Sequence, residues 1–201
     1  MHCYPQELRR TCPACKDPID PFGYHSTPCG TYNDRTSRHD SQCDLYALAG
    51  GRTGKSVVSE HKHLIPDTQK KPGDVTIASW RGMTMAAFDF TFVSPFAVSV
   101  LQQSAVRRGY AAECAEASKR EKSAELCRKE KMDFVPMAVE TCGGWGKTAL
   151  VSFWKLSILV AARFGKTHEE ELRWMLQRHS AELQRGNARM ILRRASEFEP
   201  L

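Results

Sequence analysis

The chain has 201 residues, enough for one globular domain and a small appendage, because single cores usually settle near ~100–150 residues. Its 29 lysines and arginines exceed its 23 acidic residues, and the net charge of +6 suits a polyanionic partner. No run reaches the ~20 apolar residues of a membrane span, and the first residues lack the apolar core of a signal peptide, so we expect an intracellular protein without a membrane partner.

Residues 1–31 are rich in Cys, Pro and Gly and show no helix or strand periodicity, so we predict a small module held together by a metal. A C-x2-C knuckle is followed by a histidine and a further cysteine, which together supply the four tetrahedral ligands of structural zinc. His2 or Cys3 could replace one of the four. The expected zinc ligands are Cys12, Cys15, His25 and Cys29.

Residues 32–195 are expected to form the main domain, and 196–201 a tail. The pattern predicts a helix over 34–48, a short strand near Val57, and strands over 74–80 and 85–93 that form a hairpin with its turn at Arg81-Gly82.

The second half of the main domain reads mostly as helix. The pattern predicts a helical region over 97–131 broken near Gly109, a strand over 134–140 whose proline favours a sheet edge, and a helix over 148–164 that is apolar on nearly all sides and hence buried. Thr167 and Glu170 fit a capping box that opens a last amphipathic helix. This order predicts an α/β fold with a mixed sheet flanked by helices.

The hairpin carries two acids. With the turn at Arg81-Gly82, Asp74 and Asp89 would stand opposite each other on one face, with Cβ atoms about 4.5–5.5 Å apart. Like charges so placed repel each other, and a divalent cation such as Mg²⁺ would offset the repulsion. Lys119 follows helical spacing on an inward face, from which its ammonium could reach a phosphate or an attacking water. Solvated carboxylates and a surface lysine are the alternative interpretation.

The knuckle residues, Arg38-His39-Asp40, Lys71-Pro72-Gly73-Asp74, the segment 87–95 around Asp89 and the segment 134–145 together resemble the restriction-like endonuclease region of non-LTR retrotransposons. The ordered match covers roughly residues 10–195. In that family a CCHC zinc motif precedes a PD-(D/E)xK-type nuclease.

The resemblance implies a restriction-endonuclease-like fold and nicking of chromosomal DNA, dependent on Mg²⁺ or Mn²⁺, which leaves the 3′-hydroxyl that primes reverse transcription. It implies that Asp74 and Asp89 bind the metal and that Lys119 is the catalytic lysine. Element RNA and the polymerase part of the parent polyprotein are the further partners implied, with a nuclear location.

Two positions depart from the family pattern. Ser123 stands where the family often has a tyrosine, which leaves Lys122 as an alternative to Lys119, and Thr91 stands where a strand lysine is usual. Glu60 or Glu140 could supply a third metal ligand. No polymerase motif occurs in the chain, so an inactive relic that only binds nucleic acid, or an interaction domain without nucleic acid, are the alternative functions.

Basic residues recur along the predicted helical region. Such a face could bind DNA phosphates, although a solvated helix surface has the same composition. The residues predicted to contact nucleic acid are Arg107, Arg108, Arg120 and Lys122.

Overall fold

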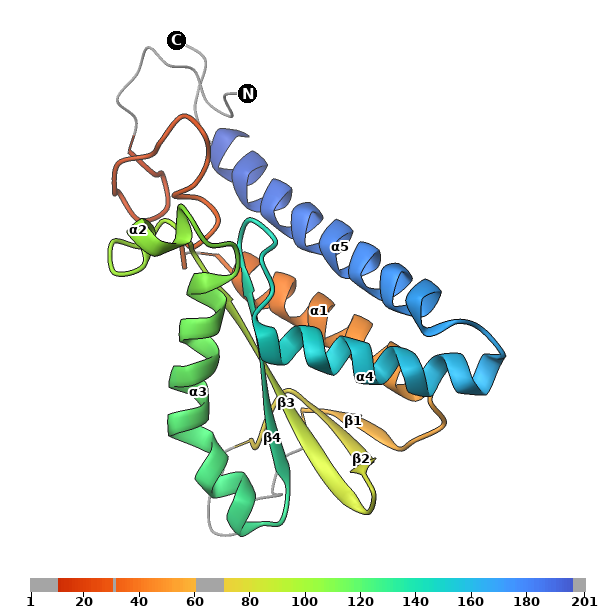
Figure 1. Ribbon diagram of the computed structural model, residues 1–201. Helices are drawn as coiled ribbons and strands as arrows, with labels where there is room; N and C mark the ends of the chain where they lie inside the picture. Colours follow the sequence, from red (N-terminus) through yellow and green to blue (C-terminus); the bar gives the residue numbers. More distant parts are fainter. Residues whose placement is uncertain (1–10, 31, 61–70, 197–201) are drawn as a thin grey trace.

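The computed structural model describes residues 11–30, 32–60 and 71–196, which form a mixed α/β fold (Figure 1). The elements follow the predicted order, and the predicted helical break near Gly109 separates α2 from α3. The elements are α1 (Asp34–Gly51), β1 (Val57–Ser59), β2 (Val75–Arg81), β3 (Thr84–Val93), α2 (Leu101–Ser104), α3 (Tyr110–Lys129), β4 (Asp133–Glu140), α4 (Lys147–Phe164) and α5 (His168–Ser196).

The four strands form one mixed sheet in the order β1-β2-β3-β4. The first three strands are antiparallel neighbours, whereas β4 runs parallel to β3. A parallel pair requires a crossover connection, and α3 provides it. Pro136 therefore lies on an edge strand, as its missing N–H predicts.

The hairpin turn is one residue further along the chain than predicted. Gly82 and Met83 form the turn, and Arg81 pairs with Thr84. Gly82 has a φ of 60°, in the left-handed region that glycine adopts without strain. A register shift between Ile77 and Arg81 compensates for the displaced turn, so Val75 still pairs with Phe88 as the prediction requires.

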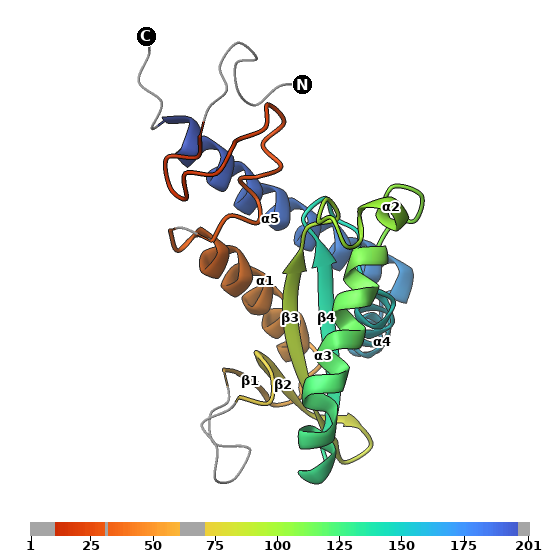
Figure 2. The same ribbon diagram turned by 90° about the vertical axis from the view of Figure 1, so that its left-hand side faces the viewer.

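The two faces of the sheet are covered by different helices (Figure 2). Phe88 and Phe90 belong to the main core with residues of α1, α4 and α5, whereas Ala87 packs with Cys127 at the end of α3. The alternation of side chains along β3 places Asp89 on the α3 face with Ala87. β3 thus contributes side chains to both layers, the main core on one face of the sheet and the α3 layer on the other.

The prediction that α4 is buried because it is apolar on nearly all sides holds for only one face of the helix. Its inner face packs in the core through residues such as Phe153 and Leu156, but Leu150, Val151 and Trp154 are 42%, 51% and 47% exposed. The sheet and α5 each cover one side of this helix, and no described element covers the remaining stripe.

Two buried carboxylates close the N-termini of helices. Glu140 accepts hydrogen bonds from the backbone N–H groups of Gly109 and Ala111 at the start of α3. Glu116 accepts those of Thr148 and Ala149 at the start of α4. These contacts satisfy N–H groups that have no partner within the helix, and a carboxylate there also interacts favourably with the helix dipole.

Candidate functional site

The structure brings the four predicted zinc ligands together. The Sγ atoms of Cys12 and Cys29 are 3.9 Å apart, and Cys15 Sγ lies 3.2 Å from His25 Nε2. The four ligand atoms all lie within 4.8 Å of one another, so this cluster could hold a structural metal ion such as zinc. The alternative ligands His2 and Cys3 lie outside the described residues.

Backbone hydrogen bonds hold this loop in a shape that gathers the ligands. The carboxylate of Asp20 accepts the N–H groups of Phe22, Tyr24 and His25, which fixes the turn that returns the histidine to the knuckle. In the knuckle itself, Lys16 N–H donates to the carbonyl oxygen of Cys12, and Lys16 adopts a φ of 68°.

The crowded thiols also fit a metal ion. Burial, together with the neighbouring thiols of Cys12 and Cys29, raises the pKa of Cys15 to about 11. A divalent cation would supply the positive charge that favours thiolates, because a coordinating thiol loses its proton.

The loop that carries the four candidate ligands, residues 12–29 (called the zinc loop below), is fixed to two distant parts of the chain. Arg194, fully buried near the end of α5, donates to the carbonyl oxygen of Cys29 at 3.4 Å. On the other side, the ring of Tyr24 stacks on Phe96, with centroids 4.0 Å apart. The loop therefore lies between the end of α5 and the segment after β3 (Figure 1).

Of the two predicted acids, Asp89 lies beside the predicted lysine. Lys119 on α3 places Nζ 2.8 Å from Asp89 Oδ2, whereas Lys122 is exposed on the same helix. Burial raises the pKa of Asp89; the carboxylate of Asp74 adds to the rise and the ammonium of Lys119 opposes it. The two acids are therefore close enough to interact.

Asp74 stands one residue before β2, and its carboxylate lies at the edge of β3. Its Oδ2 accepts the N–H of Phe90 at 2.6 Å and faces His39 Nε2 at 3.1 Å. A strand N–H points within the plane of the sheet, so this hydrogen bond holds the Asp74 carboxylate at the edge of β3. The reason is local: β2 has not yet begun at Asp74, and its side chain takes the place of a backbone acceptor.

The structure adds His39 and Cys43 to the neighbourhood of Asp74. Ligand atoms of these three residues lie within 4.8 Å of one another. The pKa of His39 is raised to about 11, mainly by its hydrogen bond to Asp74, so the imidazole is cationic at neutral pH. The sequence places His39 and Cys43 on one helix stripe, but nothing in that stripe indicates a carboxylate partner.

The proposed third metal ligands and the predicted nucleic-acid contacts are engaged in various ways. Glu140 caps α3, so both of its oxygens are committed, and Glu60 forms an ion pair with Lys71 at 2.8 Å.

The predicted basic residues are spread over 107–122. Arg107 pairs with Glu113, Arg108 donates to the Gly143 carbonyl, Arg120 donates to Thr148, and Lys122 is exposed.

No family model matches the chain, and the search of curated proteins also gave no match. Within the described part of the chain, none of the helices combines the length and the apolar character needed to cross a membrane.

Proposed function

We propose that this protein is a divalent-metal-dependent endonuclease that nicks DNA, with a restriction-like fold and a zinc module of the non-LTR retrotransposon type. The observation that carries the proposal is the meeting of Asp89, Lys119 and Asp74 along residues 89–90 of β3. Two acids that bind the metal and a lysine displaced onto a helix are the arrangement that the family resemblance implies.

The acid pair fits a hard cation. Within the described residues, Oδ1 of Asp74 and Oδ1 of Asp89 have no hydrogen-bond or ion-pair partner, which leaves one oxygen of each carboxylate available. The mutual repulsion of the two acids is the kind of interaction that Mg²⁺ or Mn²⁺ relieves. Such an ion, held by Asp74 and Asp89, would lower the pKa of a bound water and neutralise charge on the phosphate.

The protein's own groups have separate roles in this proposal. Lys119, held by Asp89, places a fixed positive charge where negative charge develops on the scissile phosphate. His39 orients Asp74 by binding Oδ2, which leaves Oδ1 as the oxygen for the metal ion. The exposed position of Lys122 favours Lys119 as the catalytic lysine.

One observation favours a second candidate function, a nuclease-like fold that only binds nucleic acid. Asp74 Oδ2 already accepts two hydrogen bonds, and the metal-ligand group that includes Asp74 contains His39 and Cys43 but not Asp89. A relic would retain the zinc module and the basic surface without cleavage. In either case DNA is the proposed ligand, a nuclear location is the proposed site of action, and element RNA and the parent polymerase are the further proposed partners.

Plasmid nicking separates these functions. The purified protein, loaded with zinc, should convert supercoiled plasmid to the open circle in Mg²⁺ or Mn²⁺. Asp74→Ala and Asp89→Ala should abolish nicking, because each removes a metal ligand. Asp44→Ala, which removes an exposed carboxylate of α1, should nick like the wild type. If the wild type shifts plasmid mobility but never nicks it, the binding function is the correct one.

A further inference from the structure

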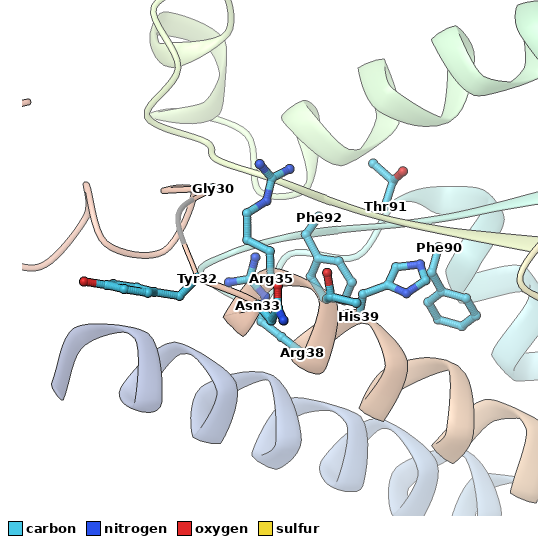
Figure 3. Close-up of a pocket in the computed structure, with 10 residues that line it drawn as sticks. Gly30, Tyr32, Asn33, Arg35, Arg38, His39, Phe90, Thr91 and Phe92 are labelled. Atoms are coloured by element: carbon cyan, nitrogen blue, oxygen red, sulfur yellow. The ribbon is translucent and has the colours of Figure 1, made fainter. Parts of the chain in front are cut away.

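A cavity of about 480 Å³ lies between the start of α1 and the second half of β3 (Figure 3). It begins beside the zinc loop and reaches His39, whose ring also contacts Asp74. Its lining combines basic and aromatic side chains with backbone of the zinc loop. The residues that line it are Gly30, Tyr32, Asn33, Arg35, Thr36, Arg38, His39, Phe90, Thr91 and Phe92.

Arg38 brings a buried positive charge to this cavity. The residue is 3% exposed, its Nη1 donates to Asn187 Oδ1 at 2.7 Å, and its guanidinium lies 4.8 Å from the centre of the Phe92 ring. Its Nε has no hydrogen-bond partner. Within the described residues no carboxylate forms an ion pair with it, and an arginine so deeply buried is almost always paired.

A second arginine increases this excess of positive charge. Arg35 lines the same cavity, is exposed, and forms no hydrogen bond or ion pair with any described residue. Burial, with a smaller contribution from repulsion by Arg35, lowers the pKa of Arg38 to about 10. Two guanidinium groups that repel each other across a cavity are an arrangement that an external anion would stabilise.

The start of α1 adds to the positive potential. The side chain of Asn33 does not cap the helix, and the first N–H groups of a helix carry partial positive charge. Asp34, the acid in this first turn, does not neutralise the cavity, because its carboxylate pairs with Arg193 at 2.9 Å and with Arg194 at 3.8 Å.

We propose that this cavity binds a backbone phosphate of the nucleic acid strand that approaches the acid pair, with Arg35 and Arg38 as the anion-binding groups. This inference rests on the proposed function, because it assigns the path of that site's substrate. His39 lines the cavity and binds Asp74, so a strand that occupies the cavity continues to Asp74. The ring of Tyr32, which is 36% exposed, offers stacking surface for a neighbouring base, which a free phosphate would not use.

The test measures binding apart from cleavage. The full chain, loaded with zinc, is titrated in Ca²⁺ against fluorescein-labelled single-stranded and duplex DNA at several salt concentrations. Arg35→Ala should weaken binding about tenfold, the usual loss for one charge-assisted hydrogen bond, and should lower the slope of log K against log salt by about one. Arg173→Ala removes an exposed positive charge near the start of α5, far along the helix from the zinc loop. This control should change neither the affinity nor the slope.

A second variant guards against a folding defect and completes the test. Arg38→Met keeps an apolar chain over Phe92 but removes the buried charge, and its thermal unfolding shows whether it folds. If the folded Arg38→Met and the Arg35→Ala proteins both bind DNA as Arg173→Ala does, the proposal is overturned.

Inorganic phosphate distinguishes a free anion from a nucleic acid. If it raises the unfolding temperature of the wild type but not of Arg35→Ala, while DNA affinity is the same for both, the site takes a free anion and the nucleic-acid assignment is wrong. Binding that depends on Arg35 in a protein that never nicks plasmid supports this inference and overturns only the nuclease function.

Discussion

The imidazole of His39 lies between two carboxylates, with Nδ1 3.1 Å from Asp40 and Nε2 3.1 Å from Asp74. The hydrogen bond to Asp74 is the main cause of its raised pKa. The cationic imidazole of His39, carried by α1, therefore holds the carboxylate of Asp74, one of the two candidate metal ligands, in its orientation.

This coupling predicts a pH dependence of stability. Because the pKa of His39 rises from 6.5 to about 11 on folding, its stabilising contribution is complete below 6.5 and is lost as pH rises toward 11. Between about pH 6 and about pH 9, the free energy of unfolding should fall by about 1 kcal/mol or more in the wild type relative to His39→Gln. Urea denaturation at the two pH values measures it.

The matched control is His168→Gln, which removes a partly exposed histidine at the start of α5. This control should keep the wild-type decline in stability. An equal decline in His39→Gln and the wild type would show that the hydrogen bond to Asp74 contributes no charge-dependent stability.

Asp74, Asp89 and His39 show which contacts of this site can be predicted from the sequence. Alternation along two strands was enough to predict that Asp74 and Asp89 approach each other, because strand register follows from the pleat and the turn. The position of the Asp74 carboxylate at the edge of β3 depends on where β2 begins. Its partner His39 is 35 residues away on another element, so no local pattern could indicate it.

At the scale of elements, the end of α5 is joined to the zinc loop by Arg194. This fully buried side chain donates to the carbonyl oxygens of Met190 and Cys29. Thiols of the zinc cluster also raise the pKa of Arg194, although burial acts in the opposite direction. An arginine in this position would balance the negative charge of a site with three thiolates.

We therefore predict that Arg194→Met lowers zinc affinity about 10- to 100-fold, the usual cost of removing a group that supports metal ligands. Competition with a chromophoric chelator measures the affinity. Arg189→Met, on an exposed face of the same helix, should bind zinc like the wild type. Equal affinities for the two variants would mean that Arg194 serves only to pack α5.

The element boundaries show which helix ends a sequence can indicate. The capping box was predicted from Thr167 and Glu170, and the structure contains both of its hydrogen bonds. The caps supplied by Glu116 and Glu140 were not predicted, because their partners lie about thirty residues away along the chain. Local chemistry indicates a cap within one turn, whereas a cap from another element requires the fold.

At the scale of the whole molecule, one buried histidine lies at the centre of the core that joins α1, α4 and α5. His179 is 1% exposed, and its Nδ1 lies 2.6 Å from Gln42 Oε1. Its ring centre lies 4.8 Å from that of Phe153 and 5.8 Å from that of Trp145. Burial lowers its pKa to about 3, so the folded protein keeps this imidazole neutral.

His179 should make the core sensitive to acid. Its pKa is 6.5 when unfolded and about 3 when folded, so the unfolded chain binds the extra proton between these values and stability falls as pH falls. The contribution should approach 1.4 kcal/mol per pH unit, the value for one proton. His179→Gln keeps a polar partner for Gln42 but cannot titrate, so its stability should fall less steeply. Tryptophan fluorescence, to which Trp145 in this core contributes, reports unfolding, and a chelating dye reports zinc release separately. If fluorescence follows zinc release equally in both proteins, acid unfolding begins at the zinc loop instead, because protonation of the metal ligands then precedes protonation of the core.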